Sequence, residues 1–256
     1  MSITIKKPSE IESLRIGGKH LAQAIFATSL HIKPGISTKE LDIIFESEVR
    51  KLGDDPAFLG YRPEGVHTPF PASLCTSIND VIVHGIPDES CILKQGDIIT
   101  LDGGLIHDGL YTDHAVSFPV GEISNETKKL LEITKNALDI GIKIIRAGAH
   151  VGDIGYAIEQ YVKPYKYGIV RELAGHGVGY TVHEDPYIPN YGKAGTGELL
   201  KAGMVLAIEP MLNIGTRFVS FSRDGYTVTT KDHNLSAHFE HTVVVTDNGC
   251  EILTKI

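Results

Sequence analysis

The chain carries the same arrangement of segments twice, and this repeat is the feature that most limits its possible folds. Each copy has a long helical segment, a glycine stop, a shorter helical segment and then strand-rich sequence. Apolar residues recur at helical spacing in these segments, and a Ser-x-x-Glu capping box opens each helix of the first copy. The helices are expected over about residues 9–33, 37–53, 124–147 and 153–162.

The two copies align when Gly35 is placed on Gly148, and the apolar positions of the shorter helices then coincide. Two helix pairs can share such spacing by chance, and that alternative stays open. A true repeat predicts one catalytic domain over residues 1–256, made of two related α+β halves at roughly 9–120 and 122–254. Such an architecture would place a site where the halves meet.

The composition excludes several classes of protein. The 32 Asp and Glu residues outnumber the 24 Lys and Arg residues, and this acidic balance argues against specific nucleic acid binding. The 3 cysteines are too few for a disulfide framework. The sequence lacks the ~18-residue apolar run of a spanning helix, and its N-terminal segment lacks the apolar core of a signal peptide. We therefore expect a cytoplasmic protein without membrane contact.

Two aspartates lie in strand-like segments that a tight turn would place side by side. Asp102 follows the apolar run 97–101, and Asp113 lies in the alternating run 109–120, with a hairpin turn expected near 106–108. A single Asp in a strand is more often an exposed or edge residue than a functional one. Two adjacent carboxylates, however, cannot both stay ionised at low cost unless a cation lies between them.

Glu209 and Glu240 are also charges inside apolar, strand-like sequence, and His176 lies between two glycines. Each of these residues alone is more often a structural polar group than a ligand. Together with Asp102 and Asp113 they form a donor set that suits a pair of divalent ions bridged by carboxylates. Two such ions, ~3.5–4 Å apart, can generate a hydroxide and stabilise the oxyanion of peptide hydrolysis.

At these positions the sequence resembles the type I methionine aminopeptidases. The resemblance runs from about residue 9 to residue 254 and rests on motifs that occur in the family's order. It implies the α+β pita-bread fold, in which two pseudo-symmetric halves surround a curved antiparallel sheet with the helices outside. The motifs are the segments 79–87, 101–113, 175–179, 183–186, 208–211 and 239–242.

The resemblance implies a dinuclear metal centre. Asp102 and Asp113 would be the first two ligands, and His176 and Glu209 would bind one ion. Asp113 and Glu240 would bridge both ions. The ions could be Co, Mn, Fe or Zn, because carboxylate-rich sites accept all of these.

The resemblance also assigns the catalytic residues. His183 would hydrogen-bond the scissile carbonyl and its developing oxyanion, and His84 would contact the peptide near the leaving nitrogen. Glu209 would carry a proton toward that nitrogen while a metal hydroxide attacks the first peptide bond. The implied activity is removal of the N-terminal methionine from nascent polypeptides whose second residue is small.

An apolar pocket for the methionine side chain is expected from motif position. Its expected lining residues are Tyr61, Phe70, Cys75 and Tyr226, with Tyr226 where the family commonly has Trp. Cys75 could instead be a nucleophile, but a metal-hydroxide mechanism needs none.

Two positions depart from the family pattern. Gly104 stands where the family commonly has Thr, so a hydroxyl near the ligands is missing and altered metal affinity is expected. His114 replaces another hydroxyl residue. It should point away from the strand face of Asp113 and is expected to be structural.

Rival functions fit the sequence less well. A zincin needs a second His four residues after the first, but Tyr187 stands four residues after His183. A dinucleotide-binding loop is also excluded, because the glycines of 175–179 do not have the G-x-G-x-x-G spacing. An Xaa-Pro peptidase of the same fold remains the main alternative, although such enzymes usually carry a large additional N-terminal domain. A non-catalytic binding module is a weaker alternative, because such relatives lose ligands that this chain retains.

The resemblance also bears on partners. Nascent chains are the expected substrates, and a monomer is the family expectation. Transient ribosome contact is a further hypothesis, resting on Lys128, Lys129, Lys163 and Lys166.

Overall fold

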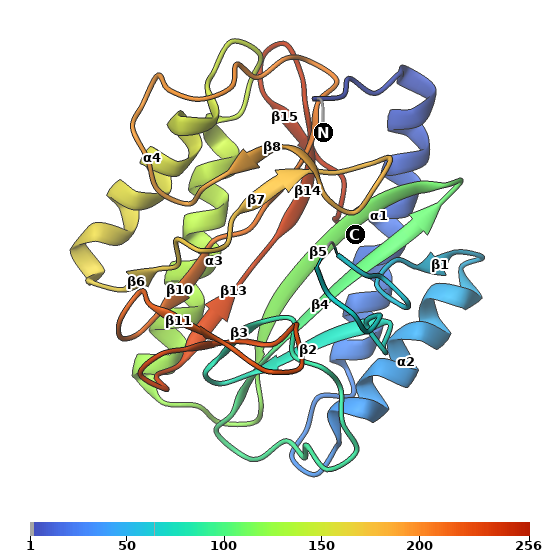
Figure 1. The fold of residues 1–256 in the computed structure, drawn as a ribbon, viewed down its shortest axis with the longest axis vertical. Helices are drawn as coiled ribbons and strands as arrows, with labels where there is room; N and C mark the ends of the chain where they lie inside the picture. Colours follow the sequence, from blue (N-terminus) through green and yellow to red (C-terminus); the bar gives the residue numbers. More distant parts are fainter. Residues whose placement is uncertain (1–2, 64) are drawn as a thin grey trace.

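Two helix pairs cover opposite sides of the molecule, with the strands between them (Figure 1). The computed structural model describes residues 3–63 and 65–256. The first pair belongs to the N-terminal part of the chain and the second pair to the C-terminal part. The helices are α1 (Pro8–Ser29), α2 (Thr38–Lys51), α3 (Asn125–Ile144), α4 (Val151–Val162) and the short 3-10 helix η1 (Lys163–Tyr165).

The helix starts follow local capping chemistry. The capping box predicted for α2 is confirmed, because the Glu40 amide donates to the Ser37 hydroxyl while the Ser37 amide donates to the Glu40 carboxylate. The box predicted for α1 at Ser9 is wrong. This helix begins at Pro8, a residue suited to the first turn, and the Lys7 amide donates to the carboxylate of Glu10 at 2.7 Å.

The glycine pair in the middle of α1 serves close packing. A Cβ atom on Gly17 would lie 2.9 Å from the Cβ of His107, and one on Gly18 would lie 2.7 Å from the carbonyl oxygen of Leu253. The two glycines therefore let α1 approach the end of a strand on one side and the C-terminal segment on the other.

The strands form antiparallel ladders, and the longest is the predicted hairpin. Its two strands turn at Asp108 and Gly109, whose φ angles of 50° and 77° suit a two-residue hairpin turn. The strands are β1 (Asp55–Pro56), β2 (Leu74–Ile78), β3 (Val81–Val83), β4 (Ile98–His107), β5 (Leu110–Pro119), β6 (Gly168–Ile169), β7 (Gly175–Gly177), β8 (Glu184–Ile188), β9 (Val205–Ile208), β10 (Met211–Asn213), β11 (Val219–Phe221), β12 (Val228–Thr230), β13 (Ser236–His238), β14 (His241–Val245) and β15 (Cys250–Ile252).

Among the described residues, this pairing gives four groups of strands. β4 is flanked by β2 and β5 and also pairs with β1, while β15, β14, β9, β7 and β8 form a second sheet. Smaller sheets have the orders β13-β10-β6 and β11-β12-β3. The amide of Glu240 donates to the carbonyl of Ala115 at 2.8 Å, so the backbone just before β14 is joined to β5.

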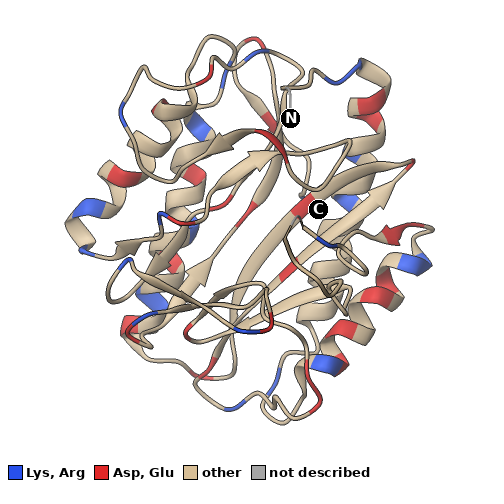
Figure 2. Ribbon diagram, viewed as in Figure 1, with Lys and Arg blue, Asp and Glu red and all other residues tan. Residues whose placement is uncertain are grey.

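Each helix pair packs on its own apolar core. One core lies between α1, α2 and the β2 and β4 strands, and the other lies between α3, α4 and strands of the C-terminal part. Acidic positions occur on the central strands as well as on the helices (Figure 2). Among the described helices, none combines the length and the apolar character needed to span a bilayer.

Candidate active site

All the site residues predicted from the sequence line one cavity of about 590 Å³. Its wall combines strand residues of the N-terminal and C-terminal parts of the chain with loop residues. The predicted residues that line it are Tyr61, Phe70, Cys75, His84, Asp102, Asp113, His176, His183, Glu209, Tyr226 and Glu240.

Antiparallel register places the two aspartates on one face of the hairpin. Asp102 pairs with Ala115 and Asp113 pairs with Gly104, so the two carboxylates are diagonal neighbours. Both residues are buried. The side-by-side arrangement predicted from the hairpin is therefore present.

Four of the carboxylates that line this cavity, those of Asp102, Asp113, Glu209 and Glu240, are difficult to ionise together. Burial raises the pKa of Asp102 to about 7. Burial, followed by the charges of neighbouring carboxylates, raises the pKa of Asp113, Glu209 and Glu240 well above the ordinary value. Such a group of acids can be fully ionised at neutral pH only with a compensating cation.

The donor atoms fit a divalent metal. One donor atom each from Asp113, His176 and Glu240 lie within 4.8 Å of one another. The Oε1 atom of Glu240 is buried and has no hydrogen-bond partner among the described residues. We call Asp102, Asp113, His176, Glu209 and Glu240 the central cluster.

The ring of His176 is oriented for metal binding. Its Nδ1 lies 2.9 Å from the carbonyl oxygen of Gly177, to which it donates, so the other ring nitrogen is left as an acceptor. That nitrogen, Nε2, lies 3.4 Å from Oε1 of Glu209. Burial lowers the pKa of His176 to about 3, which keeps the imidazole in its neutral, ligating form.

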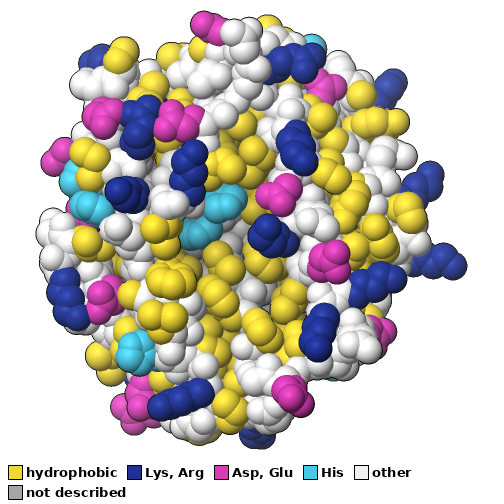
Figure 3. Space-filling view, turned by 180° about the vertical axis from the view of Figure 1, so that it is seen from behind, with side chains coloured by type: hydrophobic (Ala, Val, Ile, Leu, Met, Phe, Trp, Pro, Cys, Tyr) yellow, Lys and Arg dark blue, Asp and Glu magenta, His cyan; other side chains and the backbone are white. Residues whose placement is uncertain are grey.

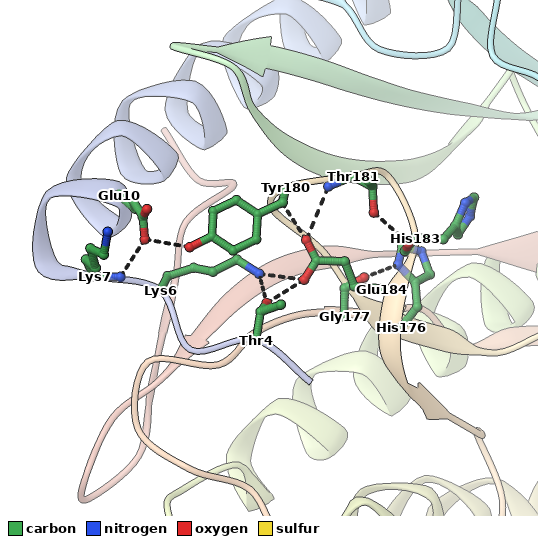
Figure 4. Close-up of polar contacts among 10 residues, drawn as sticks. All are labelled: Thr4, Lys6, Lys7, Glu10, His176, Gly177, Tyr180, Thr181, His183 and Glu184. Atoms are coloured by element: carbon green, nitrogen blue, oxygen red, sulfur yellow. Dashed lines mark hydrogen bonds and ion pairs between the residues drawn. The ribbon is translucent and has the colours of Figure 1, made fainter. Parts of the chain in front are cut away.

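His183 lies beside the central cluster, on a loop that is held in place by hydrogen bonds and an ion pair of Glu184. The Nδ1 atom of His183 is 2.8 Å from the Tyr61 hydroxyl, and its ring is 4.4 Å from that of His176. Glu184 forms a buried ion pair with Lys6 at 2.6 Å (Figure 4).

The carboxylate of Glu184 also accepts bonds from the Thr4 hydroxyl and from two loop amides, those of Tyr180 and Thr181 (Figure 4). The Thr181 hydroxyl donates to the carbonyl of His183 at 2.7 Å. The N-terminal segment therefore holds the loop that positions His183. This contact joins residues far apart in the sequence and was not predicted.

A further cavity residue, His238, was also not predicted. It is buried on β13, and its Nε2 lies 3.6 Å from Oε2 of Glu209. Neither of its ring nitrogens has a hydrogen-bond partner among the described residues. His238 lies two residues before Glu240, and residues with this spacing in an extended chain point to the same side. This spacing was the sequence signal that could have indicated His238 as a site residue.

Gly104 has a packing role that the family pattern does not indicate. A Cβ atom there would lie 2.7 Å from Cε1 of Phe58 and 2.9 Å from the Cβ of Ala57. The space of the expected Thr side chain is filled by the Phe58 ring, which also lines the cavity. A hydroxyl therefore cannot be restored at this position by one substitution without moving Phe58.

His114 and Cys75 each had two competing interpretations. His114 is buried, its Nδ1 contacts the carbonyl of Glu240 at 2.5 Å, and it stacks on His241, in agreement with a structural role. Burial raises the pKa of the Cys75 thiol well above its ordinary value, which disfavours the thiolate that a nucleophile needs.

Known proteins are similar to this chain in sequence and in fold. The sequence pattern of metallopeptidase family M24 matches residues 12–247. The chain belongs to this family. Methionine aminopeptidase 1 of Bacillus subtilis is 46% identical over 99% of the chain and 100% of its own length. The family resemblance predicted from the motifs is therefore confirmed.

Solved structures agree with this M24 assignment. Methionine aminopeptidase from Thermotoga maritima superposes with a TM-score of 0.95 at 41% identity, covering 100% of both chains. Prolidase from Pyrococcus furiosus has a TM-score of 0.79 at 23% identity, covering 98% of this chain and 65% of its own, which shows the shared fold alone. The predicted α+β pita-bread fold is confirmed.

Proposed function

We propose that this M24 metallopeptidase removes the N-terminal methionine from nascent proteins whose second residue is small. The observation that carries the proposal is the convergence of His176, three buried carboxylates and the largely buried Glu209 in a cavity that also has an aromatic wall. Relatives named methionine aminopeptidases, with 41–46% identity over nearly the whole chain, support it.

The central cluster would hold two divalent ions. Asp102 and Asp113 would be ligands, and Asp113 would bind both ions. His176 and Glu209 would complete the coordination of one ion, and Glu240 would also bind both. When bound, the ions would supply a nucleophile from water at neutral pH and Lewis-acid stabilisation of a developing oxyanion. Mn, Fe, Co and Zn all suit this donor set.

Side chains of the protein would hydrogen-bond the substrate and transfer a proton to its leaving nitrogen. With the Tyr61 hydroxyl donating to Nδ1 of His183, the proton of that imidazole lies on Nε2, where it can donate to the scissile carbonyl. His84 would contact the peptide on the leaving-group side. Glu209, whose pKa is raised by burial and by neighbouring carboxylates, would accept a proton and pass it to the leaving nitrogen.

The methionine side chain would enter the aromatic part of the cavity. Phe70 and Tyr226 pack edge to face there at 5.1 Å, and Tyr61, Cys75 and Phe58 complete the wall. Aromatic edges make favourable contacts with a thioether sulfur.

The test compares two peptides after the metal has been stripped and restored. Met-Ala-Ser should be cleaved only when Mn²⁺ or Co²⁺ is added, and Ala-Pro peptides should be cleaved far more slowly. Cleavage of the proline peptide alone would overturn the proposal in favour of an Xaa-Pro peptidase.

We also propose that one catalytic domain over residues 1–256, with halves at 9–120 and 122–254, acts as a monomer in the cytoplasm. A transient ribosome contact would use four exposed lysines, Lys128, Lys129, Lys163 and Lys166. Lys129 lies 5.5 Å from the Tyr165 ring, so α3 and η1 place these lysines near one another. Acidic and basic side chains are interspersed over the rear face of the molecule (Figure 3). Co-sedimentation with ribosomes at low salt tests the contact, and absence of binding at every salt concentration contradicts it.

A further inference from the structure

A second group of metal-type side chains lies outside the cavity and has no part in the proposed reaction. His20 comes from α1, Asp54 follows α2, and His107 ends β4. We call these three residues the outer cluster. Gly17 makes the cluster possible, because a Cβ atom there would lie 2.9 Å from the Cβ of His107.

The three side chains converge on one carboxylate. Nδ1 of His20 lies 2.7 Å from Oδ2 of Asp54, and Nδ1 of His107 lies 2.6 Å from Oδ1. One donor atom from each residue lies within 4.8 Å of the other two. The two imidazole rings meet edge to face at 5.6 Å, and both Nδ1 atoms face the same carboxylate.

The outer cluster holds a buried negative charge beside an exposed one. The Asp54 side chain is only 2% exposed, and a buried carboxylate needs a positive partner. A second, exposed carboxylate lies near Nε2 of His107: Oδ2 of Asp108 is 3.6 Å away, beyond hydrogen-bond distance, and accepts a bond from the Ser13 hydroxyl. A neutral imidazole has one N–H, so when Nδ1 of His107 donates to Asp54, the lone pair of Nε2 faces the Asp108 carboxylate, which is an unfavourable contact.

A metal ion on Nδ1 of His107 resolves this conflict. The ring proton then lies on Nε2, where the Asp108 carboxylate can accept it, as carboxylates commonly do behind ligating histidines. A doubly protonated imidazole would also satisfy both carboxylates, so direct metal measurement must decide between the two.

We propose that His20, Asp54 and His107 form a second divalent-metal site, which takes Zn²⁺ or a similar borderline ion through two imidazole nitrogens and one carboxylate oxygen. Two imidazoles select such ions over Ca²⁺ and Mg²⁺, which prefer oxygen ligands. The partly exposed histidines leave room for water to complete the coordination. The ion would join α1, the segment after α2 and β4, so its role is structural.

The test counts bound zinc in three forms of the full-length protein. Metal-stripped wild type, the double variant His20→Gln/His107→Gln and the control His31→Gln are dialysed against the same buffered free Zn²⁺, and bound zinc per chain is measured. His31 is exposed and lies outside the cluster. Wild type and control should each bind one ion more than the double variant, and Zn²⁺ should raise the melting temperature of the double variant less.

Equal zinc counts in wild type and the double variant would overturn the proposal and leave a hydrogen-bonded cluster with a protonated histidine. If the double variant does not fold, a zinc anomalous map of wild-type crystals decides. A peak about 2.0–2.1 Å from both Nδ1 atoms supports the site. A map with zinc in the cavity and none at the outer cluster contradicts it.

Discussion

The central and outer clusters contain similar ligating groups, but they differ in how far their carboxylates are hydrogen-bonded and their charges compensated by other side chains. In the outer cluster, both oxygens of one buried carboxylate are bonded by two imidazoles. In the central cluster, burial raises the pKa of all four carboxylates, and the charges of neighbouring carboxylates raise those of Asp113, Glu209 and Glu240 further. An oxygen of Glu240 has no partner among the described residues. The outer cluster can therefore fold without a metal, whereas the central cluster carries a charge conflict that a metal would remove.

The largest expected effect of a single change is on catalysis at the central cluster. Glu240→Gln keeps the shape of the side chain but removes its charge. We expect the rate of Met-Ala-Ser cleavage to fall by more than about 100-fold, since even residues behind metal ligands commonly cost 10–100-fold. Steady-state kinetics with saturating Mn²⁺ measures it, and the exposed control Glu122→Gln should leave the rate unchanged. A rate within tenfold of wild type would remove Glu240 from the ligand set.

The next largest effect concerns the contact that holds the His183 loop. Lys6→Met should lower the free energy of unfolding by about 2 kcal/mol, less than the 3–5 kcal/mol typical of breaking a buried pair, because Glu184 keeps its other donors. Turnover should also fall, because the loop would no longer hold His183 in place. Urea unfolding and peptide kinetics measure the two effects. The exposed neighbour Lys7→Met is the control, and equal behaviour of both variants would show that the pair positions nothing.

The same substitution should have opposite effects in the two clusters. In metal-free protein at pH 8, Asp113→Asn should raise the free energy of unfolding, because it removes a charge that the other carboxylates oppose. Asp54→Asn should lower it, because a charged hydrogen-bond acceptor is lost. Each change should be about 1–2 kcal/mol. Chemical unfolding of both variants in a chelator tests this, and shifts of the same sign would refute the comparison.

An effect of similar size is expected at Gly104, where the Phe58 ring fills the space of the Thr side chain that the family commonly has. Gly104→Thr should destabilise the protein by about 1–3 kcal/mol through overpacking against Phe58. Combining it with Phe58→Ala should cost less than the sum of the two single changes. A double-mutant cycle in urea measures the coupling, and additive free energies would show that the Thr side chain finds space elsewhere.

Sequence patterns predicted the parts of the site that depend on local order. The Asp102–Asp113 hairpin follows from strand alternation and a two-residue turn. The motif segments contain the metal-ligand candidates and both candidate catalytic histidines, and all of these line the cavity. The helix pairs followed from apolar spacing and capping. The error at the start of α1 arose because two overlapping capping patterns compete there and Pro8 favours the earlier one.

The contacts that could not be predicted join distant segments. Lys6 and Glu184, Phe58 and Gly104, and the three residues of the outer cluster meet only after the chain has folded. No periodicity links such residues, because each depends on how whole elements pack. The family pattern suggested a lost hydroxyl at Gly104, but only the packing showed that an aromatic ring had taken its place.

The stability of metal-free protein between pH 4 and pH 7 tests the central claim most directly. The pKa of Asp102 is raised from 3.8 to about 7, so the folded state binds more protons than the unfolded state in this range. The free energy of unfolding of metal-free protein should therefore fall as pH rises, by on the order of a few kcal/mol. Saturating Mn²⁺ should abolish that fall, because it replaces the protons. A stability that neither falls with pH nor responds to Mn²⁺ would contradict a metal centre at the central cluster.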